Sequence, residues 1–112
     1  MNANDFFKEY NCTENYYKHF SGLVYTDGVR ALCIECASYW LLDVIGSYQN
    51  SLKQQEFQVW KLTKNADDTA VITCGDGNDN ILVGQKIEFT DFKFDVATIY
   101  VENNVILLPS ER

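Results

Sequence analysis

The order of apolar and polar residues divides the chain into a helical half and a strand half. Over residues 28–50, apolar side chains recur at the spacing of an amphipathic helix. At 100° per residue, one face of this segment gathers Val29, Cys33, Cys36, Trp40 and Val44. Thr26 or Asp27 is a good N-cap. Because the stripe keeps its phase past Ala37 and Ser38, we expect one long helix to about residue 50, although Ser38 could cap a second helix instead.

The rest of the first half predicts short helices. Asn4 or Asp5 is a suitable cap for a helix that runs to about Tyr10. The aromatic-rich residues 14–20 predict a second short helix. Residues 1–52 are therefore expected to be mainly helical.

From Glu56 the apolar spacing changes to two, which is typical of strands. We expect strands over 56–63 and 69–74, then one over 81–83 and 86–89 with a bend at Gly84. A last hairpin joins 97–101 to 105–108 through Asn103 and Asn104, which tolerate positive φ. In the first strand, Phe57, Val59 and Leu62 are expected on one face and Trp60 on the other.

These elements predict the α+β class, within one domain over residues 1–112. Residues 56–109 should form an antiparallel β-meander of about four to five strands, because short turns join successive strands. The long helix and one or two short helices should cover one face of this sheet.

Charge is unevenly placed along the 112 residues, whose net charge is −7. Residues 65–112 hold nine acidic and three basic side chains, so a negative field should surround the strand half. This disfavours direct binding to nucleic acid or anionic membranes and suits a protein partner with a basic surface. The first residues lack an apolar signal-peptide core, and we expect a cytoplasmic protein.

The four cysteines leave alternatives open. Cys33 and Cys36 have the CxxC spacing of redox and zinc sites, but both thiols fall on the apolar helix face, where packing in the core is expected. A zinc site from Cys12, His19, Cys33 and Cys36 would need an unusual ligand spacing. Alternatively, His19 packs among its aromatic neighbours.

Asp43 is the most informative single residue, because it projects onto the apolar face of the expected helix. A buried carboxylate must be paired or hydrogen-bonded. Asp43, with its neighbours Trp40 and Tyr39, therefore forms either a structural anchor or the edge of a pocket.

Known motifs of catalysis and cofactor binding are missing from the sequence. Neither a phosphate-binding glycine loop nor a nucleophile signature occurs, so no cofactor, metal or catalytic residue is expected. Residues 76–80 begin like a calcium loop, but Ile81 and Ile87 stand where glycine and glutamate are needed. A tight turn is expected there.

Six segments together resemble an uncharacterised family of small domains found in bacteria, phages and other mobile elements. They are YTDGV (25–29), SYWLLD (38–43), EFQVWKL (56–62), DGN (76–78), FTDF (89–92) and LLPSE (107–111). The resemblance implies a stand-alone domain of unknown function and assigns no role to any residue.

We hypothesise a small acidic, non-enzymatic protein-interaction module. Its concrete form is a phage-encoded inhibitor of host defence, similar to anti-CRISPR proteins, whose carboxylates contact a basic, nucleic-acid-binding effector. The candidate contact residues are Asp67, Asp68, Asp76, Asp79, Glu88, Asp91, Asp95, Glu102, Tyr16 and Tyr17. One alternative is a small enzyme or ligand-binding domain around Asp43, with His19 or Cys36. Another is a structural domain that forms a homodimer through an exposed strand edge, at 105–108 or 56–63.

Overall fold

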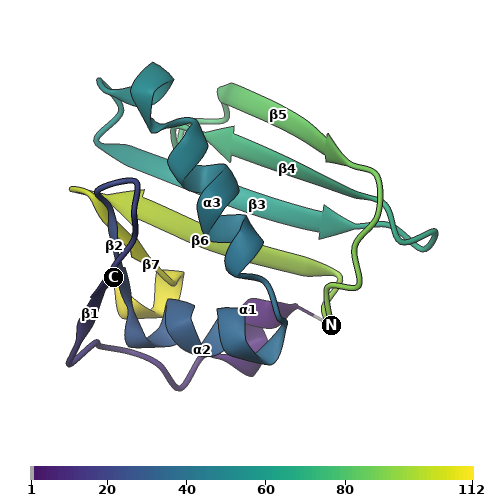
Figure 1. The fold of residues 1–112 in the computed structure, drawn as a ribbon, viewed down its shortest axis with the longest axis horizontal. Helices are drawn as coiled ribbons and strands as arrows, with labels where there is room; N and C mark the ends of the chain where they lie inside the picture. The colour runs from purple at the N-terminus through teal and green to yellow at the C-terminus, as the bar shows by residue number, and fades with distance from the viewer. Residues whose placement is uncertain (1) are drawn as a thin grey trace.

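The structure is a computed structural model that describes residues 2–112. Within this range, seven strands form one mixed sheet in the order β1-β2-β7-β6-β3-β4-β5 (Figure 1). The strands are β1 (Tyr16–Lys18), β2 (Val24–Thr26), β3 (Phe57–Lys64), β4 (Ala70–Gly75), β5 (Ile81–Ile87), β6 (Val96–Glu102) and β7 (Val105–Leu107). The α+β class is confirmed, but the sheet has more strands than expected.

The helices are short. They are α1 (Ala3–Phe6), α2 (Asp27–Glu35) and α3 (Tyr39–Ser47), with 3-10 turns η1 (Gln49–Leu52) and η2 (Pro109–Glu111). Helices α2 and α3 lie on the same face of the sheet (Figure 1). No helix formed by residues 2–112 is long and apolar enough to cross a membrane.

The prediction of a single long helix was wrong, because helical structure is interrupted between α2 and α3. Ala37 adopts a left-handed conformation with φ 49°. The amide of Ser38 then donates to the carbonyl of Cys33 (2.9 Å) and that of Ala37 to Ile34 (3.4 Å), which closes α2 in a Schellman motif. Ser38 precedes α3, but its side chain makes no capping bond. Thr26 caps α2 as expected, accepting a bond from the amide of Val29.

The prediction of a simple antiparallel meander was also wrong, because β6 pairs with β3 and not with β5. Residues 88–95 carry the chain across the end of the β3–β4 hairpin, where Thr90 donates to the carbonyl of Asp68 (2.8 Å). The same segment buries Phe92 and Phe94. Their burial holds the crossing segment against the core. The spacing of apolar residues within strands gives no sign of such a crossing.

Residues 14–20 contain strand β1 and not the short helix that was expected. Tyr17 of β1 pairs with Tyr25 of β2, which in turn pairs in parallel with Ile106 of β7. The first half therefore contributes two strands to the sheet. Cross-strand pairing outweighs the weak local preference for a helix here.

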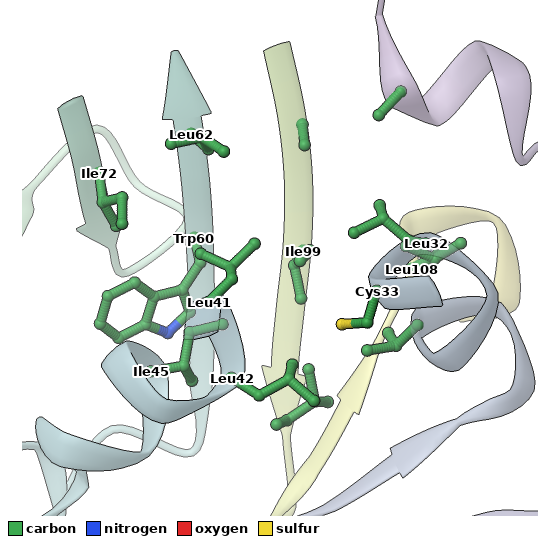
Figure 2. Close-up of a cluster of buried hydrophobic side chains, with 14 of the residues drawn as sticks. Leu32, Cys33, Leu41, Leu42, Ile45, Trp60, Leu62, Ile72, Ile99 and Leu108 are labelled. Carbon is green, nitrogen blue, oxygen red and sulfur yellow. The ribbon is translucent and has the colours of Figure 1, made fainter. Parts of the chain in front are cut away.

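The core lies between the sheet and helices α2 and α3. Figure 2 shows Leu41 and Ile45 of α3 beside Trp60 of β3, while Leu32 and Cys33 of α2 lie near Leu108. All of these residues are buried. Trp40 and Val44 are only partly buried, because the break rotates α3 relative to the stripe expected for one helix.

The buried face of β3 differs from the expected one. Gln58, Trp60 and Leu62 point into the core, whereas Phe57 and Val59 occupy the other face and are half-buried. Gln58 is tolerated inside because it exchanges amide hydrogen bonds with Gln49 (3.0 Å each) and accepts one from the Trp60 indole (2.9 Å).

The two strands expected to offer a free edge for dimerisation are both internal strands of the sheet. Strand β7 is flanked by β2 and β6, and β3 is flanked by β6 and β4. The terminal strands of the sheet are β1 and β5. Residues 105–108 and 56–63 therefore cannot pair with a second chain, because their neighbours already occupy both edges.

Candidate functional site

A cleft lies between α1, with the turn that follows it, and the outer side of α2. Its volume is about 700 Å³. We call it the α1–α2 cleft, and its walls are formed by Phe6, Phe7, Glu9, Tyr10, Cys12, Glu14, Asn15, Asp27, Arg30, Ala31, Ile34 and Glu35. It belongs to the helical half and lies outside the carboxylate-rich strand half singled out by the sequence.

Asp27 shapes this cleft by tying the loop before β1 to the start of α2. Its carboxylate accepts bonds from the amides of Glu14 (3.0 Å) and Asn15 (3.3 Å) and from the Tyr17 hydroxyl (2.8 Å). The bond from Tyr17 is the largest of the effects that lower the pKa of Asp27. The same bond raises the pKa of Tyr17. The loop is therefore held by an ionised carboxylate at neutral pH.

The cleft combines exposed apolar surface with negative charge. Phe6 is 48% exposed and Ile34 is 55% exposed, and both lie in the same concave site. Four carboxylates line the cleft against one guanidinium, that of Arg30. Arg30 lies over the Tyr17 ring, 5.1 Å from its centroid, and Glu35 pairs with Lys93. The remaining field favours a cationic ligand.

Asp43 is not buried, and its side chain is 56% exposed. The break at Ala37 turns this part of α3 outward. One carboxylate oxygen lies 2.9 Å from Nε2 of His19, in the loop between β1 and β2. The His19 side chain is only 8% exposed. This contact joins the loop to α3, but the expected position of Asp43 on the buried apolar face was wrong, because its side chain lies at the surface.

The two neighbours of Asp43 have different surroundings. Tyr39 is 43% exposed, and its ring meets that of Tyr25 edge-on at 6.4 Å. Trp40 is half-buried and packs against the core. The structure therefore does not gather Trp40, Tyr39 and Asp43 into one pocket wall.

The thiols of Cys33, Cys36 and Cys74 lie in the core, as expected for the CxxC pair. Burial raises the pKa of Cys33 to about 12 and also raises that of Cys36. Because metal binding and thiol redox chemistry need the thiolate, this environment opposes both. Cys12 is exposed, and His19 bonds to Asp43 and Ser21 instead of joining a cysteine cluster.

The eight candidate carboxylates divide between the two ends of the sheet. The β3–β4 turn and the 88–95 segment meet at one end and carry Asp67, Asp68, Glu88, Asp91 and Asp95. Asp76, Asp79 and Glu102 lie near the opposite end, by the β4–β5 and β6–β7 turns (Figure 1). They therefore do not form one continuous row.

Several of these carboxylates stabilise turns. Asp76 accepts bonds from the amide of Asn78 (2.8 Å) and the side chain of Asn80 (2.8 Å). These bonds lower its pKa. The tight turn expected at residues 76–80 is thus confirmed. Glu102 pairs with Arg112 at 3.1 Å.

The two candidate tyrosines belong to β1. Tyr16 is 60% exposed, whereas Tyr17 is half-buried under its bond to Asp27. Neither tyrosine lines the α1–α2 cleft, but Tyr17 contacts two residues that do, Asp27 and Arg30. The exposed apolar pair of the cleft was not predicted. Its one signal in the sequence is Ile34, an apolar residue on the polar side of the predicted helix.

The family comparison covers the whole chain. Residues 1–112 match a family of unknown function, DUF6876. No curated protein and no solved structure matches the chain. The match confirms the resemblance to an uncharacterised family that the sequence suggested. The chain belongs to the DUF6876 family of unknown function.

Proposed function

We propose that this protein is a protein-interaction module whose α1–α2 cleft binds a segment of a partner that carries basic and apolar side chains. The observation that supports this is the pairing of exposed Phe6 and Ile34 with a mainly acidic lining. Apolar contacts in a concave site supply affinity, and complementary charge supplies orientation and association rate.

The shape of the cleft supports a short peptide segment as its ligand. A volume of about 700 Å³ is within the range of sites that enclose small ligands. Asp27 and its bonds to Glu14, Asn15 and Tyr17 hold one wall in place before binding. A preorganised wall lowers the entropic cost of association.

Selection from a displayed library of random peptides tests the proposal. We expect the enriched peptides to carry Lys or Arg next to an apolar residue. Ile34→Ser should weaken their binding about tenfold or more, because it removes apolar contact area. Binding should also weaken as salt rises, because the carboxylates lie near the surface.

Matched variants control this test. Ile81→Ser removes another isoleucine, 66% exposed on β5, and should leave binding unchanged. Glu14→Gln should weaken binding, whereas Glu88→Gln should not, because Glu14 lines the cleft and Glu88 does not. Enrichment of acidic peptides, or equal effects of the two isoleucine variants, would disprove the role of the cleft.

A narrower form of the proposal makes the partner a nucleic-acid-binding effector. The protein would then be a phage-encoded inhibitor of host defence, comparable with anti-CRISPR proteins. The gathering of five carboxylates at the 65–69 and 88–95 end of the sheet supports it, since such a cluster can occupy a site built for phosphates.

Plasmid interference in cells tests this narrower form. Expression of the protein in a bacterium with an active CRISPR system should restore transformation by a targeted plasmid. Amide substitutions at Asp67, Asp68 and Asp91 should remove this effect, while the same change at Asp79 should not. Unchanged interference would reject the inhibitor hypothesis and leave the cleft proposal standing.

A further inference from the structure

Three side chains far from the cleft form a hydrogen-bonded line. Oγ of Ser21 lies 2.7 Å from Nδ1 of His19, and Nε2 of the same ring lies 2.9 Å from a carboxylate oxygen of Asp43. Ser21 and His19 belong to the loop between β1 and β2, and Asp43 belongs to α3. A hydroxyl, an imidazole and a carboxylate in series are the groups that activate a serine nucleophile.

The backbone favours one tautomer of the His19 ring. The amide of Ser21 donates to Nδ1 of His19 at 3.2 Å, which suits the tautomer whose proton is on Nε2. In this tautomer the Ser21 hydroxyl donates to Nδ1 and the Nε2 proton is donated to Asp43. Neutral His19 can therefore accept the hydroxyl proton of Ser21, and its bond to Asp43 fixes the orientation of the ring.

The loop that carries Ser21 and His19 packs closely against α3. Gly46 lies one turn beyond Asp43 on α3, directly under the loop. A Cβ at Gly46 would come within 2.8 Å of Ser21 Cβ and 3.0 Å of His19 Cε1. Because the His19 side chain is only 8% exposed, its ring is held in the line by packing as well as by hydrogen bonds.

Ser21 is accessible from solvent. It is half-buried at a tight turn before Gly22, and it borders a depression of about 510 Å³. Gly22, Lys53, Asn103 and Asn104 also line that depression. A small electrophile can thus reach Ser21 from this depression, which shares no lining residue with the α1–α2 cleft.

We propose that Ser21 is an activated nucleophile that takes up acyl groups from activated esters. Oγ forms a bond to the ester carbonyl carbon while its proton passes to Nδ1 of His19. The bond from that carbon to the leaving oxygen then breaks, and the leaving group takes the proton from His19. Asp43 is the positioning residue that stabilises the protonated ring.

The backbone amides limit which electrophiles react. The amide of Gly22 donates to the carbonyl of His19 (3.1 Å), and that of Leu23 donates to Ser21 Oγ (3.3 Å). Neither is free to stabilise an oxyanion, a contribution that is often the largest in acyl transfer. The reaction is therefore restricted to esters with good leaving groups.

Incubation of the purified full chain with p-nitrophenyl acetate tests the proposal. We expect a burst of one p-nitrophenolate per chain, and a single acetyl group on Ser21 by peptide mass spectrometry. Ser21→Ala should abolish the burst. His19→Gln should slow it on the order of 10²-fold, as expected for loss of a general base. Asp43→Ala should also slow it, by less than His19→Gln does, because water can replace this exposed partner of the ring.

Ser51→Ala is the matched control, since the Ser51 hydroxyl donates to the carbonyl of Tyr48 and not to an imidazole. It should leave the burst unchanged. Circular dichroism checks that each variant is folded. If His19→Gln unfolds, Asp43→Ala still tests the proposal, because Asp43 is exposed and its loss should not disturb the core. Acetylation of Ser21 no faster than in the urea-unfolded chain, or equally fast in Asp43→Ala, would overturn the proposal.

Discussion

Two carboxylates, Glu111 and Asp27, join segments that are distant in the sequence. Glu111 accepts bonds from the Thr26 hydroxyl (2.6 Å) and from the amides of Gly28 (3.1 Å) and Leu108 (2.9 Å). It thereby places negative charge at the start of α2, where the helix dipole favours it. Gly28 is required for this contact, because a Cβ there would lie 2.7 Å from the Glu111 carboxyl carbon.

Glu111→Gln should lower the free energy of unfolding by about 1.5–3 kcal/mol, the usual contribution of hydrogen bonds to a charged group. The amide keeps the shape of the side chain but turns an NH₂ group toward donors. Urea denaturation measures the loss. Glu88→Gln, at an exposed position, should change stability little, and an equal loss in both variants would contradict the role of Glu111.

Asp27 gives a pH-dependent contribution to stability. Its bond from Tyr17 lowers its pKa below the ordinary value of 3.8. The unfolded chain therefore binds the proton more readily, and the stabilisation is present above pH 3.8 and disappears as the pH falls through the folded value. Asp27→Asn should thus be less stable than the wild type at pH 7, with a difference that shrinks below pH 3.8.

Urea denaturation of both proteins at pH 7 and at several values below pH 4 measures this difference. Asp5→Asn provides the control, since Asp5 is exposed. A difference between wild type and Asp27→Asn that stays constant over the whole range would contradict an ionised carboxylate in the loop.

At the scale of elements, the break between α2 and α3 decides how the helices meet the sheet. Ala37 must be left-handed for the Schellman bonds to form. A residue with a Cβ pays a steric cost in that conformation. The break lets α3 turn its Leu41, Leu42 and Ile45 inward, which a continuation of α2 would not do.

Ala37→Gly should therefore raise the free energy of unfolding by about 1 kcal/mol, because relief of the left-handed strain exceeds the entropic cost of glycine. In an unbroken helix the same change would lower stability by a similar amount. The sign of the change in thermal melting temperature distinguishes these two structures. Ala31→Gly, inside α2, should be destabilising.

At the scale of the whole molecule, the sheet ends in two strands that resist pairing with another copy. Strand β1 has three residues. Strand β5 is longer, but it carries a bulge where it meets Cys74 and Gly75, and Lys86 is its single charged side chain. Short edges, bulges and edge lysines all oppose addition of a further strand. The chain is therefore expected to be monomeric.

Lys86→Val should promote self-association, because it turns the exposed edge of β5 into an uncharged apolar strand. Light scattering should show a mass that rises with protein concentration. Lys61→Val is the matched control, since Lys61 is exposed on β3 inside the sheet and has no free strand edge. A monomeric Lys86→Val protein would show that the bulge alone protects the edge.

The sequence by itself determined the features that depend on neighbouring residues. Strands β3, β4 and β6 lie close to their predicted bounds, because period-two spacing reports on the pleat. Asn103 and Asn104 adopt the positive φ expected of their turn, and Thr26 caps α2. The inward position of Cys33 followed from the helical spacing alone.

Only the tertiary structure decided the features that join distant segments. The pairing of β6 with β3, the amide pair of Gln58 and Gln49, and the contact of His19 with Asp43 all depend on residues brought together by folding. The break at Ala37 belongs here too, since alanine gives no local signal for a left-handed turn. The cleft was likewise unpredictable, because its walls come from α1, the 12–15 loop and α2, whose mutual placement no local pattern encodes.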